Sequence, residues 1–250
     1  YQIGAEHPNA VLYPLLVPFK SEQFERRDIA SSLFDRLRNR YQSIVNGIVL
    51  LANELIRVAS SWMETIKETL EEYSRAFIIQ NDIPKMMNHI QFILNIVKKE
   101  PETFYEVSFL SQFGRLIQDV EFWLTVYDKT KDEACLHQIC QKLQTIYNLL
   151  CPIIDDMKVI PLIDVSPILS HFHHDEIAVP GSFEANKSLI SINSFGETMT
   201  IIKSKQRPRK MQVLSNNGEK YTFLLKAHED TRLDERVMQL FNLINTLFNQ

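Results

Sequence analysis

The sequence contains few cysteines, few glycines and no excess of basic charge. Only 3 of its 250 residues are cysteine and only 6 are glycine. A small, odd number of cysteines argues against a disulfide framework and suits a reducing compartment. The scarcity of glycine excludes collagen-like or flexible-linker character. The 27 Lys and Arg against 31 Asp and Glu give a formal net charge of −4, which argues against nucleic-acid binding through bulk charge.

Long apolar runs are also missing. The longest, Ile44 to Ile56, is interrupted by Asn46, Asn53 and Glu54. It is shorter than the roughly 20 residues that a membrane-spanning helix needs, so we predict no membrane span. The sequence begins with Tyr1 and shows no charged segment followed by an apolar core, so no signal peptide is visible. We expect an internal segment of a longer protein.

The composition that remains is that of a globular protein, with 45% hydrophobic and 23% charged residues. The length allows one or two domains with sizeable cores. The pattern changes near residue 150, with helical periodicity before it and short alternating runs after it. The fold class we predict is α+β and multidomain.

Residues 1–47 read as a short helical or loop piece followed by a helix. Pro8, Pro14 and Pro18 predict breaks in the first part. From Ser21 onward, apolar residues recur at a spacing of four, which predicts a helix.

Residues 48–150 carry four amphipathic stripes, which predict a four-helix up-down bundle. Asn81-Asp82 ends the first stripe and offers a cap for the second. The stripes run from Leu55 to Phe77, from Met86 to Val97, from Tyr105 to Tyr127 and from Leu136 to Leu150.

Residues 151–175 have three prolines and little periodicity, and we interpret them as a connector. Strand patterns follow at 189–194, 198–203, 211–214 and 220–226, with the hairpin signal Asn217-Gly218 between the last two. An amphipathic helix ends the chain. A small antiparallel sheet followed by one helix has the shape of a kinase N-terminal lobe, although the pattern alone does not choose it over other α+β domains.

Two motifs allow both a functional and an ordinary reading. Lys226 ends the strand-like run YTFLLK, where a lysine can hold nucleotide phosphates and a nearby acid such as Glu229 or Asp234 can fix its position. The ordinary reading is a solvated lysine beside a helix start. NSFGETMTI could be a turn covering phosphates, but it has only Gly196 and matches no phosphate-loop pattern, so alone it is a hairpin.

Other clusters favour ordinary readings. KSKQRPRK (203–210) has five basic residues in eight, which suits an anion or nucleic-acid patch or a solvated edge strand. In HFHHDE (171–176), solvated histidines are favoured over a metal site. The three cysteines lack C-x-x-C spacing, and no nucleophile motif is found. We predict no metal site in this sequence.

Several segments resemble the target-of-rapamycin (TOR) kinases, of the phosphatidylinositol 3-kinase-related (PIKK) class. SKQRPRK (204–210) and YTFLLKAHEDTRLDERVMQLFNLINTLF (221–248) are very near the family pattern, and IAVPGSF (177–183) resembles the start of its kinase domain. ELIRVASSW (54–62), LEEYSR (70–75) and SFLSQFGRLIQDVEFW (108–123) resemble the FKBP–rapamycin-binding (FRB) bundle. HPNAVLYPLLVPFKS (7–21) resembles the end of the helical FAT region.

The resemblance implies the domains and the activity. Residues 1–47 would end the FAT region, 48–150 form the FRB bundle and 176–250 the kinase N-lobe. The full-length protein would be a serine/threonine protein kinase that uses ATP and Mg²⁺ in growth and nutrient signalling, with TOR-complex subunits and protein substrates as partners. The FRB bundle would gate the cleft and recruit substrates.

The resemblance also assigns residues to the nucleotide. Lys226 would hold the phosphates, Glu229 and Asp234 would position that lysine or border the phosphate site, and the turn with Thr198 and Thr200 would cover the phosphates. The catalytic loop and the DFG motif of the family are absent. We therefore expect no catalytic residue or metal ligand in this stretch, which lacks a C-lobe and would be inactive alone.

The drug-binding groove departs from the family. Leu70 and Ser74 match, but Ile66 and Cys140 stand where tryptophans are usual, and Ile78 stands where a phenylalanine is usual. Gln141 replaces an Asp, Gln144 replaces a Tyr, and Tyr147 replaces a Phe but stays aromatic. Because large stacked surfaces are lost, we expect weak or absent FKBP–rapamycin binding.

Two alternatives stay open. The chain could belong to a non-catalytic recruitment or scaffold module of a degenerate kinase, or to a related lipid kinase. The location we expect is cytoplasmic, with membrane association through complex partners and a nuclear location left open.

Overall fold

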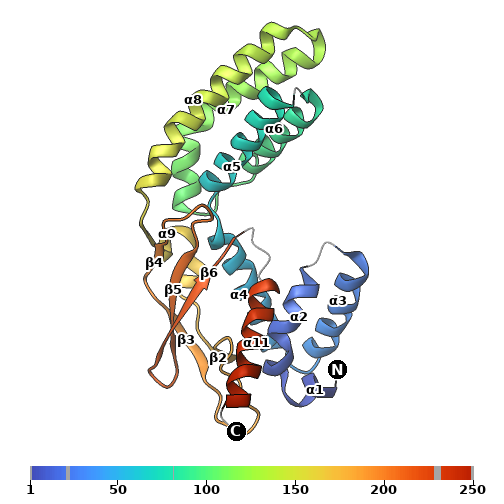
Figure 1. Cartoon of the computed structure of the whole chain (residues 1–250), viewed down its shortest axis with the longest axis vertical. Coiled ribbons are helices and arrows are strands. Elements are labelled where there is room, and N and C mark those ends of the chain that lie inside the picture. Colours follow the sequence, from blue (N-terminus) through green and yellow to red (C-terminus); the bar gives the residue numbers. More distant parts are fainter. Residues whose placement is uncertain (1, 21–22, 81, 228–231, 249–250) are drawn as a thin grey trace.

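The computed structural model describes residues 2–20, 23–80, 82–227 and 232–248. A helical part lies at one end of an elongated molecule and an antiparallel sheet lies at the other, with the N-terminal helices beside the sheet (Figure 1). The predicted combination of a helical part with a small antiparallel sheet is therefore confirmed.

The N-terminal part contains α1 (Gln2–Glu6), α2 (Pro8–Phe19), α3 (Phe24–Arg38) and α4 (Gln42–Ala59). Contrary to the predicted breaks, α2 continues through Pro14 and Pro18. Each proline removes one hydrogen bond and strains one turn. Packing of α2 against α3 outweighs this cost, since the rings of Phe19 and Phe34 lie 4.7 Å apart and Leu12 is buried.

The first stripe of the predicted bundle is not one helix. It breaks at Ser60-Ser61 into α4 and α5 (Trp62–Ser74), and the two helical stretches meet at a bend of 55°. The Ser61 side chain accepts a hydrogen bond from the Glu64 backbone, and Glu64 accepts one from the Ser61 backbone at 2.9 Å. This capping box starts a new helix, which periodicity alone does not reveal.

Helix α5 shares an apolar core with the helices that follow it. They are η1 (Arg75–Ile79, a π-helix), α6 (Ile83–Val97), α7 (Phe104–Thr130) and α8 (Glu133–Asp156). The fully buried side chains of this core include Ile66, Met86, Ile90, Phe109 and Ile139. We call α5–α8 the helical bundle. Helix α4 lies outside it, because the buried residues of α4 belong to the second core, beneath the sheet.

The sheet is antiparallel and has six strands. They are β1 (Val159–Pro161), β2 (His174–Ala178), β3 (Ser191–Phe195), β4 (Thr198–Ile201), β5 (Arg209–Ser215) and β6 (Lys220–Leu225). Strand β5 pairs with β6, and also with β4 near its start and with β3 near its end. The hairpin reading of residues 193–201 is therefore wrong, because β3 and β4 follow one another along β5. At the irregularity between them, the Gly196 amide donates to the Gln212 carbonyl at 2.8 Å.

The predicted connector is itself structured. It supplies β1, α9 (Leu162–Val165), α10 (Pro167–Ser170) and the start of β2. Ser166 caps α10 by accepting from the Leu169 backbone at 2.9 Å, and Pro167 occupies a favoured first-turn position. Such short elements have too few residues to show periodicity.

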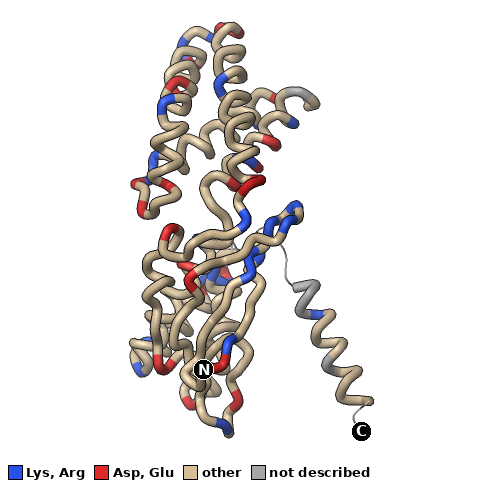
Figure 2. The backbone as a smooth tube through the Cα atoms, turned by 90° about the vertical axis from the view of Figure 1, so that its left-hand side faces the viewer, with Lys and Arg blue, Asp and Glu red and all other residues tan. Residues whose placement is uncertain are grey.

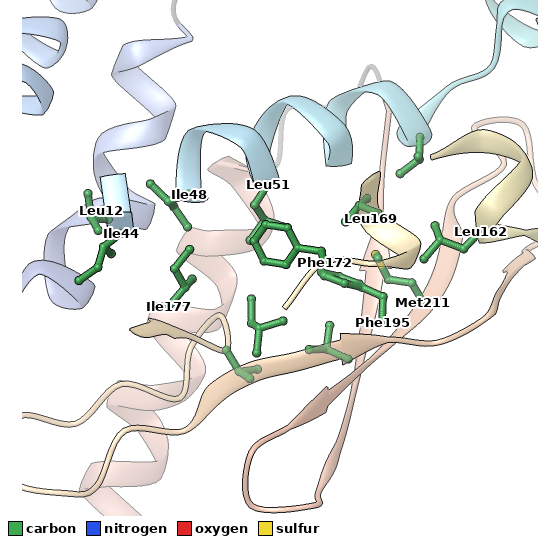
Figure 3. Packing of buried hydrophobic residues seen from close by; sticks show 14 of the residues in the cluster. Leu12, Ile44, Ile48, Leu51, Leu162, Leu169, Phe172, Ile177, Phe195 and Met211 are labelled. Atoms are coloured by element: carbon green, nitrogen blue, oxygen red, sulfur yellow. The ribbon is translucent and has the colours of Figure 1, made fainter. Parts of the chain in front are cut away.

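Helix α4 and the α9–α10 segment cover one face of the sheet. Figure 3 shows Leu51 of α4 pointing toward Phe172, which lies beside Phe195 of β3. The Phe172 and Phe195 rings lie 6.0 Å apart at 71°. This core fixes one face of the sheet and leaves the other face open.

Helix α11 (Arg232–Phe248) stands apart from the sheet and the bundle (Figure 2). Most of its described apolar side chains are exposed, among them Phe241 and Phe248. Within the described ranges, no single helix is long and apolar enough to cross a membrane. Among the same residues, only α4 taken together with residues 62–77 has the length and composition of a membrane span, and the two stretches are bent by 55° relative to each other.

Candidate functional site

The open face of the sheet carries a row of side chains that crosses four strands. Val159 of β1 pairs with Thr200 of β4, Thr200 pairs with Lys210 of β5, and Lys210 pairs with Leu224 of β6. All four are exposed, including the two apolar ones at 52% for Val159 and 48% for Leu224. Because neighbouring residues of a strand face opposite sides, this row lies opposite the buried core.

Lys226 lies one residue beyond the buried-side pair Arg209–Leu225, at the end of β6. The alternation along β6 places Lys226 on the open face together with Leu224. Ile202 extends the same face from β4, is 42% exposed, and donates from its backbone to the Pro208 carbonyl at 2.9 Å. A lysine and two exposed apolar side chains therefore lie on the same face, next to the loop of residues 203–208.

The structure brings together only part of the predicted nucleotide set. Thr200 lies in the exposed row, whereas Thr198 is farther from Lys226, at the opposite end of β4. Glu229 lies outside the described residues. Asp234 lies in α11, but its side chain is not described.

Sequence reasoning missed Ile202, Leu224 and the neighbouring loop. The alternation in YTFLLK places Leu224 opposite the partly buried Phe223 and Leu225, so an apolar residue on an otherwise polar face was visible in the sequence. The loop was noted only for its charge. Its place beside Lys226 depends on the register between β5 and β6, which the sequence does not show.

The helical bundle has a cavity of about 480 Å³ between α5, η1 and α8. It unites five of the predicted groove residues: Leu70, Ser74, Cys140, Gln144 and Tyr147. Three others are placed differently. Ile66 is fully buried in the core, Gln141 contacts His137 at 2.8 Å instead of lining the cavity, and the side chain of Ile78 is not described.

Tyr73 and Phe77 line this cavity and were not predicted. The Tyr73 hydroxyl lies 2.9 Å from the Cys140 sulfur, across the floor of the groove. Burial, together with this contact, raises the pKa of Tyr73, so its hydroxyl stays protonated. The Tyr147 hydroxyl donates a hydrogen bond to Glu71 at 3.3 Å. Its contact with Cys151, followed by burial and the nearby charge of Glu71, raises the pKa of Tyr147 to about 12. The groove thus combines aromatic walls with a polar floor.

The histidine cluster makes local contacts. His173 lies 3.1 Å from Asp175, and His174 contacts Ser43 of α4. Within the described part of the chain, no three His, Cys, Asp or Glu side chains converge as a metal site. Cys135 is buried, whereas Cys140 is only partly buried and lines the cavity.

Comparison with known proteins identifies the family. Residues 54–151 match the family model of the FKBP12-rapamycin binding domain. Over 98% of its length the chain is 37% identical to serine/threonine-protein kinase TOR2 of Saccharomyces cerevisiae, 37% to serine/threonine-protein kinase TOR of Arabidopsis thaliana and 31% to the target of rapamycin homolog of Caenorhabditis elegans. This chain belongs to the TOR kinase family.

The match to the TOR family locates the two candidate sites. The FKBP12-rapamycin binding domain match covers the helical bundle with its cavity, and the sheet lies in the part of the chain that follows. The chain spans about a tenth of the length of these TOR relatives, two of which are named serine/threonine-protein kinases.

Proposed function

We propose that this chain is part of a TOR-type serine/threonine protein kinase and that the open sheet face is its nucleotide-binding side. One observation carries the proposal: Ile202 and Leu224 lie exposed beside Lys226, on the face that the core does not cover. An exposed apolar pair suits a purine base, and a lysine on a strand suits phosphate oxygens as a point charge.

The residues present fit ATP but supply only part of its site. Thr200 adds a hydroxyl, and Lys210 adds a second positive charge in the same row. Bound Mg²⁺ would neutralise charge on the phosphates. We propose that its ligands and the catalytic base come from the remainder of the full-length protein, which would transfer the γ-phosphate to protein substrates in growth signalling.

The test is Lys226→Ala in the full-length protein. We expect kinase activity to fall about a hundredfold or more, because a preorganised charge at the phosphates is lost, while the unfolding temperature stays near that of the wild type. Lys220→Ala is the matched control, since Lys220 is exposed at the other end of β6, and it should leave activity unchanged. Wild-type turnover in the Lys226 variant contradicts the assignment.

This experiment also separates the two alternatives. A scaffold module of a degenerate kinase gives no phosphoryl transfer even in the wild-type protein. A lipid kinase phosphorylates phosphoinositide vesicles but not peptide substrates. We favour the protein kinase because the relatives are named serine/threonine-protein kinases.

A second function concerns the bundle cavity. We propose that this groove, with its aromatic walls, recruits protein substrates or TOR-complex subunits near the nucleotide face, in the cytoplasm or at membranes reached through such partners. The carrying observation is the cavity of about 480 Å³. We propose that FKBP–rapamycin binds weakly or not at all, because Cys140 and Gln144 line this cavity where the family has large aromatic side chains.

Returning a large aromatic side chain to the groove should therefore strengthen drug binding. Cys140 lines the cavity, and its sulfur lies 2.9 Å from the Tyr73 hydroxyl. We expect Cys140→Trp to strengthen rapamycin-dependent FKBP capture about tenfold or more, because it adds stacked surface to the wall of the groove. Pull-down with purified FKBP and rapamycin measures this. Nanomolar capture by the wild type would disprove the argument from lost aromatic surface.

A further inference from the structure

The most deeply buried charge among the described residues joins the helical bundle to the sheet. Arg209, the first residue of β5, is 2% exposed, and its guanidinium donates to the Glu64 carboxylate and to the Val58 carbonyl. Arg207, in the loop before β5, donates from Nε to the same carboxylate at 3.1 Å. One carboxylate thus receives two arginines, and we call these three residues the Glu64 cluster.

The cluster connects segments that are distant in the sequence. Arg207 also donates from Nη2 to the carbonyls of Ile154 at 2.7 Å and Met157 at 3.1 Å, where the bundle ends. Glu64 accepts from the Ser61 backbone at 2.9 Å, where the bundle begins. The two ends of the bundle, where the chain enters it from α4 and leaves it toward β1, are therefore held by one group of charges. Figure 2 shows basic residues gathered where the two parts meet.

The backbone of the loop is held in an unfavourable conformation. Arg207 has φ = 47°, in the left-handed region that non-glycine residues seldom adopt. Such a conformation persists where the surroundings over-determine it, and Arg207 has three acceptors that do so. The loop of residues 203–208 therefore keeps its shape through contacts made on its bundle side.

The opposite side of that loop borders the proposed nucleotide face. Pro208 accepts from the Ile202 amide, and Arg209 pairs with Leu225, the residue before Lys226. Buried ion pairs often add little net stability, because desolvation offsets their attraction. Arg209 Nε is buried with no hydrogen-bond partner among the described residues, so the compensation for its charge depends on Glu64.

We infer that Glu64 is a positioning residue for the nucleotide: through Arg207 and Arg209 it sets the 203–208 loop against the face that carries Ile202, Leu224 and Lys226. The inference rests on the proposed nucleotide function of that face. On this inference, the Glu64 cluster determines both the orientation of the helical bundle and the affinity for ATP.

The test is Glu64→Gln in the full-length protein, with MgATP as the nucleotide. The side chain keeps its shape and loses its charge. We expect the KM for ATP to rise roughly tenfold, with kcat changed by less than about twofold. Amide hydrogen exchange in peptides covering 203–208 should become faster. Glu72→Gln is the matched control, because it removes a charge from the same helix in an exposed pair with Arg75 and should change neither quantity.

A second variant distinguishes positioning from mere stability. Adding Arg207→Gln to Glu64→Gln should raise the KM for ATP by less than the product of the two single effects, because both act on one contact. A lower unfolding temperature with an unchanged KM for ATP overturns the inference and leaves the nucleotide site intact. Failure of the wild-type protein to bind MgATP overturns the proposed function itself. If Glu64→Gln does not fold, Arg207→Lys, which keeps the charge, takes its place with the same readouts and expected results.

Discussion

At the residue scale, Gly47 shows how closely two parts of the molecule approach. It lies in α4, and a Cβ added there would come within 2.7 Å of His174 and of Ile177 on β2. His174 is held in place by its contact with Ser43 of the same helix. The absence of a side chain at position 47 therefore allows α4 to lie directly on the edge of the sheet.

We expect Gly47→Ala to destabilise the chain even though alanine favours helices. The gain in helix propensity is about 1 kcal/mol, whereas forcing a methyl group into a filled space costs about 1–3 kcal/mol. Gly114→Ala in α7 is the matched control, because a Cβ there meets no atom within 4 Å, and it should stabilise by about 0.5–1 kcal/mol. Urea unfolding measures both. Equal stabilisation by the two substitutions would show that α4 and β2 separate easily.

Residues whose position depends on local pattern were predictable from the sequence, whereas residues whose role depends on tertiary contacts were not. The place of Lys226 at the end of a strand followed from local alternation, since β6 ends at Leu225. Thr198 and Thr200 were expected in a turn, from the family resemblance, but both lie within β4. Arg209 was assigned only to a basic patch, because its partner Glu64 lies 145 residues away in the sequence. Tyr73 was not predicted as a groove residue, because its place there depends on a contact between α5 and α8, in which Tyr73 faces Cys140.

At the element scale, the sequence located most helices and four strands but not their breaks. Periodicity predicted a helix through Leu55 to Phe77, because the apolar spacing hardly changes across Ser60-Ser61. The signal for the break was the S-x-x-E capping box formed by Ser61 and Glu64. The interruption at Gly196 was likewise taken for a hairpin. Only the pairing of both β3 and β4 with β5 shows that the chain continues along β5 instead of turning back on itself.

At the scale of the whole molecule, the bundle and the sheet have separate apolar cores, and charged contacts join them. Met157 packs against both cores, and the Glu64 cluster lies next to it. Apolar packing has little orientational preference, whereas a carboxylate shared by two arginines fixes angles as well as distances. The relative orientation of the two parts therefore depends on the ionisation of Glu64.

This dependence predicts a loss of stability in acid. Burial alone would raise the pKa of Glu64, but Arg209, the hydrogen bonds from Ser61 and the one from Arg207 together lower it below the ordinary value of 4.5. A carboxyl whose pKa is depressed by folding stabilises the protein above its unfolded pKa, and this contribution is lost as the pH falls through the folded value. We expect the unfolding temperature of the wild type to fall more steeply below pH 4.5 than that of Glu64→Gln. Calorimetry over this pH range measures the difference in unfolding temperature. Glu72→Gln is the control and should follow the wild type. Parallel curves for the wild type and Glu64→Gln would show that the Glu64 carboxylate does not couple the bundle to the sheet.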